Sequence, residues 1–183
     1  MIPAGYMLKR IAKAPEWLEC SHIHNVYSVS GCISKDFADY IDFWKHNRYW
    51  FFDSQEIIYQ IALQNKIQIL NCEMLYYEIY EKEFNEEWKS IEDDFKLGYN
   101  VEIPKRKEFI GYDIVSYSQR NKHECSPLSC NNLCEMVDVN ENCLLDDLEI
   151  TIKLVESLDI TKAEPGPYRI ISVNKVEPEK TQV

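Results

Sequence analysis

The chain has 183 residues, of which 45% are hydrophobic and 28% charged, so its composition and length are those of a globular fold of one ordinary domain. Its formal net charge of −11 argues against a nucleic-acid partner, because binding to phosphates relies on Lys and Arg to displace counterions. The sequence contains no run approaching the ~18 apolar residues that suggest a membrane span. The glycine-rich phosphate-binding motifs G-x-x-x-x-G-K-[ST] and G-x-G-x-x-G are also absent.

The N-terminus and the cysteine content bear on the compartment. Residues 1–8, MIPAGYML, are too short for the apolar core of a signal peptide, and Lys9 and Arg10 follow them rather than precede them. The seven cysteines cannot all pair within one chain, because their number is odd. We therefore expect a soluble, cytoplasmic protein with reduced cysteines and no membrane partner.

Two segments near the N-terminus favour extended chain. Residues 6–11, YMLKRI, predict a first strand bracketed by Pro3 and Pro15, because proline is poorly tolerated inside a central strand. Residues 20–30 are rich in Val and Tyr, which also favours an extended conformation.

Two helices are expected next. Ser34 can cap the first, whose apolar side chains recur at i, i+3, i+4 and i+7, namely Phe37, Tyr40, Ile41 and Trp44. Asp53 and Glu56 have the spacing of a capping box and predict the start of the second helix.

The rest of the sequence predicts four further strands and two further helices. The strands are expected over 67–70, 74–81, 109–118 and 168–176, where β-branched and aromatic residues gather. Residues 84–95 predict a helix capped by Asn85, because apolar side chains recur there every three to four positions. A polar loop over 97–108 follows, and a clean helical stripe begins at the capping box of Asp146 and Glu149.

These elements indicate an α+β fold. We expect a single domain over residues 1–176 with a central, mostly antiparallel sheet and helices packed against it, followed by a flexible tail over 177–183. A mixed sheet is the alternative, because predicted helices separate some of the strands.

The cysteine-rich stretch 121–147 is the first candidate site. Cys125, Cys130, Cys134 and Cys143 offer thiolate ligands, which zinc prefers in a tetrahedral set. Their spacing lacks the paired C-x2-C pattern of common zinc modules. The alternative is four buried thiols that pack as small hydrophobic side chains, with no cofactor bound.

The same stretch permits thiol catalysis. Ser126 and Pro127 predict a helix start, so Cys125 would lie just before a helix N-terminus, where the partial positive charge favours a thiolate. His123 is two positions away and would lie on the same side of an extended chain, where it could act as the base.

Cys20, His22 and His24 form a second candidate metal set. Side chains at i, i+2 and i+4 project from one face of a strand, and a thiolate with two imidazoles suits zinc or copper. The alternative is that the two histidines lie in an exposed loop.

Two functions remain open from the sequence. The acidic charge, the many tyrosines and tryptophans and the lack of a catalytic motif favour a protein-interaction module, such as an inhibitor, an immunity-type protein or an adaptor, whose partner has a basic surface. The alternative is an enzyme or metalloprotein that uses the segment 123–143 as a thiol nucleophile or a zinc site.

Overall fold

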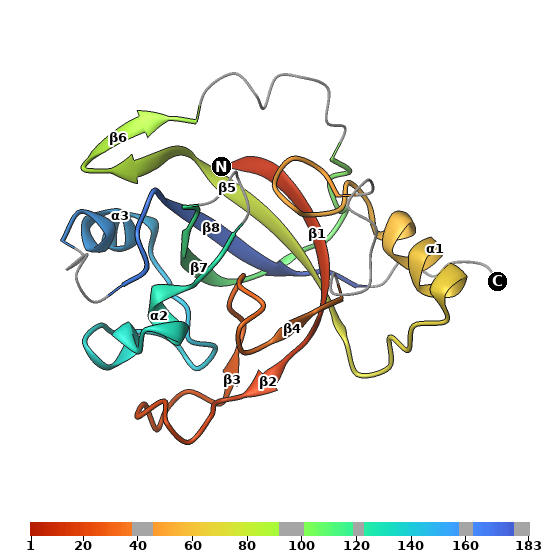
Figure 1. The fold of residues 1–183 in the computed structure, drawn as a ribbon, viewed down its shortest axis with the longest axis horizontal. Helices are drawn as coiled ribbons and strands as arrows, with labels where there is room; N and C mark the ends of the chain where they lie inside the picture. Colours follow the sequence, from red (N-terminus) through yellow and green to blue (C-terminus); the bar gives the residue numbers. More distant parts are fainter. Residues whose placement is uncertain (38–45, 92–100, 119–122, 158–162, 178–183) are drawn as a thin grey trace.

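A computed structural model describes residues 1–37, 46–91, 101–118, 123–157 and 163–177. A curled antiparallel sheet with few helices makes up most of the fold (Figure 1). Its strands, in spatial order, are β4 (Lys35–Asp36), β1 (Ile2–Arg10), β5 (Glu73–Asn85), β8 (Tyr168–Lys175) and β7 (Glu108–Ser116), with β6 (Glu87–Ser90) also paired to β5. Every pairing between these strands is antiparallel. The α+β class and the antiparallel sheet are thus confirmed for the described residues.

The remaining elements lie around the sheet. β2 (Ala12–Lys13) and β3 (Asn25–Val26) form a separate two-stranded ribbon. The helices are α1 (Gln55–Asn65), α2 (Pro127–Cys130), a short 3-10 helix (Leu133–Glu135) and α3 (Leu148–Ser157). Figure 1 shows α1 on one side of the sheet and α2 and α3 on the other. None of the helices in the described part of the chain is long and apolar enough to cross a membrane.

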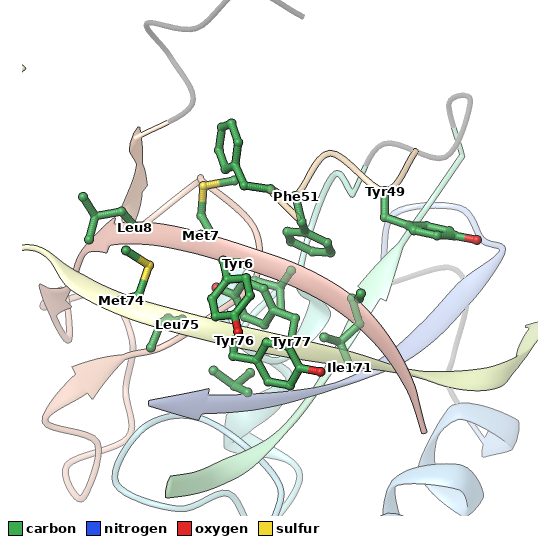
Figure 2. Close-up of a cluster of buried hydrophobic side chains, with 14 of the residues drawn as sticks. Tyr6, Met7, Leu8, Tyr49, Phe51, Met74, Leu75, Tyr76, Tyr77 and Ile171 are labelled. Carbon is green, nitrogen blue, oxygen red and sulfur yellow. The ribbon is translucent and has the colours of Figure 1, made fainter. Parts of the chain in front are cut away.

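Large aromatic side chains form much of the core beside β1 and β5. Tyr6 packs on Tyr76 with ring centroids 5.0 Å apart, and Phe51 packs on Tyr77 at 4.7 Å. Figure 2 shows these rings gathered with Met7, Leu75 and other apolar side chains. Because buried aromatic side chains each remove a large apolar area from water, this cluster is a main source of the fold's stability.

Two halves of the chain share the same construction, which we name after their central asparagines. The Asn47 loop (residues 46–54) packs on β1 and leads into α1, and the Asn140 loop (residues 139–147) packs on β7 and leads into α3. In each loop the asparagine Oδ1 accepts two backbone N–H groups, and its Nδ2 donates to the backbone of the neighbouring strand, at Ala4 or Ile110. The loops then pair with the strands at Tyr6–Phe52 and Tyr112–Leu145.

Glycines make this close contact possible in both halves. Gly5 has φ 134° and Gly111 has φ 144°, and each lies at a register shift of its strand. A Cβ atom added at Gly5 would lie 2.7 Å from the Cβ of Phe51, and one added at Gly111 would lie 2.5 Å from the Cβ of Leu144. The order β1-β5-β8-β7 therefore sets two equivalent β–loop–α–β units side by side in the sheet.

Several sequence expectations are wrong in the described residues. The helix predicted over 84–95 is instead a β-hairpin through residue 90, in which Phe84 pairs with Trp88 around Glu86. Residues 67–70 form no strand. Ser34 caps no helix there, since its hydroxyl donates to the Val26 carbonyl and residues 35–36 form β4; residues 38–45 of that predicted helix lie outside the described chain.

The other predicted elements are present with shifted ends. β1 begins at residue 2 and passes through Pro3 at the register shift, so proline does not bracket it as expected. The helix predicted from Asp53 is α1, whose N-cap is Ser54, and the helix predicted from Asp146 is α3, which begins at Leu148. The strands predicted over 74–81, 109–118 and 168–176 correspond to β5, β7 and β8.

Candidate functional site

The cysteine-rich stretch follows the free edge of β7. Its first residues run alongside that strand, where Glu124 N–H donates to the Ser116 carbonyl and Ser116 N–H donates to the Cys125 carbonyl, both at 2.9 Å. α2 then begins at Pro127, as the sequence predicted. Ser126 occupies the N-cap position, but its hydroxyl donates to the Asp113 carboxylate instead of capping the helix.

Three cysteines from two distant segments converge beside α2. The Sγ atoms of Cys32, Cys125 and Cys130 all lie within 4.8 Å of one another. Cys125 is buried, Cys130 is half-buried and Cys32 is exposed, so the cluster opens to solvent on one side. Hydrogen bonds from the Cys125 and Cys130 thiols lower the pKa of Cys32, whereas the hydrogen bonds of Cys125 with Cys130 and Cys32, together with burial, raise the pKa of Cys125. We call this group the Cys32 cluster.

Three other cysteines form a second, closed cluster. The Sγ atoms of Cys20 and Cys134 are 3.3 Å apart, and Cys143 hydrogen-bonds to Cys134. All three are buried. The hydrogen bond from Cys143, with a second from Cys20, outweighs burial and lowers the pKa of Cys134 to about 7. The four cysteines predicted as one metal set are therefore divided, with Cys125 and Cys130 in one cluster and Cys134 and Cys143 in the other.

The second predicted set, Cys20, His22 and His24, does not share one face. The segment is a turn rather than a strand, and β3 begins only at Asn25. Cys20 points to Cys134, whereas the His22 Nε2 lies 2.9 Å from the carbonyl oxygen of Val139, and His24 is exposed. The expectation that their side chains project together is wrong, because it assumed an extended chain over 20–30.

His123 is turned toward a buried acid. Its Nε2 lies 3.5 Å from Asp36 Oδ2, and its ring stacks on Phe51 at a centroid distance of 5.1 Å and an angle of 5°. The Cys125 sulfur lies in the Cys32 cluster. The geometry thus directs these two side chains to different partners, and the catalytic roles given to them from the sequence stay predictions.

A buried ammonium group holds the loop that carries Cys32. Lys9 is completely buried, and its Nζ donates to the carbonyls of residues 28, 29 and 30 at 2.8–2.9 Å. Its Nζ also lies 2.7 Å from Asp36 Oδ1. Burial opposes ionisation of Asp36, but Lys9 and then His123 outweigh it and lower the pKa of Asp36 to about 2. The loop conformation over 28–36 therefore depends on this ion pair.

A second buried acid joins the same loop to α2. Asp113 Oδ2 accepts the Val29 N–H at 2.7 Å, and its other oxygen accepts the Ser126 hydroxyl. Its side chain is fully buried, and burial raises the pKa of Asp113 to about 7 despite these two hydrogen bonds. Sequence reasoning missed Lys9, Cys32, Asp36 and Asp113, because their partners lie far away in the chain.

A pocket lies at the start of α3. It has a volume of about 310 Å³ and is lined by three acidic and five apolar residues: Val137, Asp138, Val139, Leu145, Asp146, Asp147, Ile150 and Leu154. Ile150 is 59% exposed beside it. The sequence predicted Asp146 only as part of a capping box and did not predict the pocket, which forms where the Asn140 loop meets α3.

The pocket's acids have different structural roles. Asp146 accepts the Asn140 Nδ2 at 2.7 Å, just as Asp53 accepts from Asn47 in the other half. Asp147 accepts the Ile150 N–H at 2.9 Å, as Ser54 accepts from Ile57. Asp138 is exposed, and among the described contacts it neither bonds to the loop asparagine nor caps α3. Two of the acids are therefore explained by the loop's construction, and the third is not.

Comparison with known proteins gave no match to a protein-family model, to a curated protein or to a solved structure.

Proposed function

We propose that this protein is an acidic interaction module that binds a basic protein surface through the pocket at the start of α3. The observation that carries the proposal is the composition of that pocket, in which apolar walls and three aspartates face one cavity of about 310 Å³. A Lys or Arg side chain suits such a cavity, because its aliphatic stem packs on apolar groups while its charged end reaches a carboxylate.

The net charge supports a basic partner. A formal charge of −11 attracts positively charged surfaces and speeds association with them. The pocket adds a place where that attraction acts at short range, since Asp138, Asp146 and Asp147 border it together. An inhibitor, an immunity-type protein or an adaptor would each use such a surface.

The comparison of the two halves identifies the residue to test. Asp146 and Asp147 hold the Asn140 loop and cap α3, so their substitution would disturb the fold as well as the pocket. Asp138 contributes charge to the pocket but makes neither of these hydrogen bonds. The sequence has Lys45 at the corresponding position of the first half. The charge of Asp138 is therefore the feature that the shared framework does not require.

Photo-crosslinking tests the proposed surface. A benzophenone amino acid at position 150, beside the pocket, is expected to crosslink a basic protein in cells that express the full chain. The matched control carries the same amino acid at position 63 on α1, where Leu63 is 81% exposed. Figure 1 shows α1 on the opposite side of the sheet from α3. The Asp138→Lys substitution in the position-150 variant is expected to abolish the crosslink. Equal crosslinking from both positions, or a crosslink that survives Asp138→Lys, would contradict the proposal.

A further inference from the structure

We propose that Cys32, Cys125 and Cys130 form a zinc site with three thiolate ligands and a fourth position open to water. This site is separate from the pocket at the start of α3 and does not depend on the interaction function. It also differs from the metal set expected from the sequence, because it includes Cys32 and excludes Cys134 and Cys143.

The three sulfur atoms are close to the arrangement that zinc requires. Tetrahedral zinc binds thiolates at ~2.3 Å, which places two ligand sulfurs about 3.8 Å apart. The Sγ atoms of the cluster already lie within 4.8 Å of one another without a metal. Small rotations about the Cys side-chain bonds therefore suffice to close the site.

The three ligands are held by elements whose positions are fixed independently. Cys125 is fixed by its backbone pairing to Ser116 at the end of β7, and Cys130 by the end of α2. Cys32 follows the loop 28–30, which the Lys9 ammonium holds through its three carbonyls. Such preorganisation favours metal binding, because the ligands need not be collected from a flexible chain.

The surroundings also suit a negatively charged set of ligands. The Ser30 hydroxyl lies 3.4 Å from Cys130 Sγ, within reach of a hydrogen bond to a thiolate. Cys32 is exposed, so a metal ion can enter and a water molecule can complete the coordination.

The second cysteine cluster is a weaker candidate. Cys20, Cys134 and Cys143 are all buried, which leaves no path for a hydrated ion. Among the described residues, the Cys32 cluster is the one group of three or more His, Cys, Asp or Glu side chains whose possible metal-ligand atoms all lie within 4.8 Å of one another. The closed cluster is better explained as buried thiols that pack in the core like small hydrophobic side chains.

Cobalt and zinc titration tests the site. The full-length protein, reduced and kept without oxygen, is titrated with Co²⁺, and bound cobalt is then displaced by Zn²⁺. We expect one equivalent of Co²⁺ with the strong ultraviolet absorption of a thiolate–cobalt bond, and displacement by one equivalent of Zn²⁺. Because each thiol must lose its proton to bind, the affinity is expected to fall as the pH is lowered.

Single substitutions distinguish the two cysteine clusters. Cys32→Ala and Cys130→Ala are expected to weaken zinc binding at least 100-fold, whereas Cys134→Ala in the closed cluster and Cys72→Ala outside both clusters leave it unchanged. Cys32 is exposed, so its variant should unfold at the same temperature as the wild type, and its loss of binding then reports the site and not the fold.

Two results would overturn the zinc site. The first is wild-type affinity no higher than that of Cys32→Ala. The second is binding that survives Cys32→Ala but is lost in Cys134→Ala. The reduced wild-type protein could also take up no cobalt and form a disulfide through Cys32 on exposure to air. That outcome counts as the first result, because wild-type affinity then does not exceed that of Cys32→Ala, and it shows that the cluster is a redox pair and not a zinc site.

Discussion

Two buried acids with opposite pKa shifts hold the loop that carries Cys32. Asp36 is ion-paired with Lys9, and its pKa is lowered to about 2. Asp113 accepts hydrogen bonds from Val29 and Ser126, and its pKa is raised to about 7 because it is fully buried. Asp36 therefore stabilises the fold once it is ionised, and this contribution is lost as the pH falls below the ordinary range of a carboxyl toward 2.

Asp113 has the opposite effect on stability. Its pKa in the folded protein, about 7, lies above the ordinary value of 3.8, so folding takes up a proton between these two pH values. The contribution of Asp113 is therefore largest below about pH 4 and is lost as the pH rises through about 7. A protonated Asp113 can donate its O–H to Ser126 while its other oxygen still accepts the Val29 N–H, so the neutral form keeps both hydrogen bonds.

The Asp113→Asn variant isolates this effect. The amide mimics the protonated acid, because its Nδ2 can donate to Ser126 and its Oδ1 can accept from Val29. We expect the variant to be as stable as the wild type at about pH 3.5 or below, where Asp113 is protonated in the folded and the unfolded protein, and more stable by about 1–4 kcal/mol near pH 8. Urea unfolding at a series of pH values measures the difference. Identical pH dependences for the two proteins would show that folding does not raise the pKa of Asp113.

At the scale of elements, the Asn47 and Asn140 loops are the repeated unit of the fold. Each asparagine makes hydrogen bonds to its own loop, to the adjacent strand and to the aspartate that precedes the helix. A side chain that satisfies several backbone groups at once is hard to replace, because its loss leaves those groups unpaired.

Equivalent substitutions in the two loops are expected to have similar effects. Asn47→Ala and Asn140→Ala each remove two acceptor and two donor contacts and should reduce the free energy of unfolding by about 2–4 kcal/mol. The Asp variants retain the acceptor oxygen but set a carboxylate oxygen against the strand carbonyl and the loop aspartate, both of which are acceptors, so they should lose at least as much. As a control, Asn65→Ala removes a single bond to the Ile61 carbonyl of α1 and should cost about 1 kcal/mol or less. An Asn140→Ala variant as stable as this control would contradict the equivalence of the loops.

The loops explain why the helix starts predicted from the sequence were each one residue early. Asp53 and Asp146 have the residue type of an N-cap, but each accepts a hydrogen bond from its loop asparagine. The helix N–H groups bond instead to the next residue, Ser54 or Asp147. Local pattern alone cannot distinguish these two uses of an aspartate.

Other differences have the same origin in distant contacts. Phe84 and Trp88 are spaced as on a helix face. Positions four apart also face each other across a tight hairpin, and the antiparallel pairing of β5 with β6 shows that the chain forms the hairpin and not the helix. The predictions over β5, β7 and β8 were correct because their β-branched and aromatic residues suit a buried sheet whatever the partner strand. The repeat of the two β–loop–α–β units was missed, because the two halves share only scattered Gly, Tyr, Asn and Asp positions.

The candidate sites could be predicted only where they are local. The helix start at Pro127 followed from sequence spacing. The contact of Cys32 with Cys125 depends on the sheet order and on Lys9, neither of which a spacing rule contains. The same holds for the pocket, whose acids come from the Asn140 loop and from a position before it.

At the scale of the whole molecule, the proposed function makes charge and pocket act together. On this proposal, the net charge of −11 attracts a basic partner over a long range, and the aspartates at α3 orient it at short range. Salt screens the first effect more strongly than the second, because screening grows with the distance between the charges. Binding should therefore weaken with salt without disappearing.

The most direct test is the salt dependence of affinity for the basic protein captured at position 150. Calorimetric titration should show wild-type binding that weakens at least tenfold from about 0.05 to about 0.5 M salt. At low salt, Asp138→Lys should bind at least tenfold more weakly than wild type, a loss of about 1.4 kcal/mol. Glu56→Lys, an equal change of charge on exposed α1, should stay within about threefold of wild type, because it alters only the long-range field. Equal losses in the two variants, or binding that salt does not affect, would contradict an acidic pocket as the binding site.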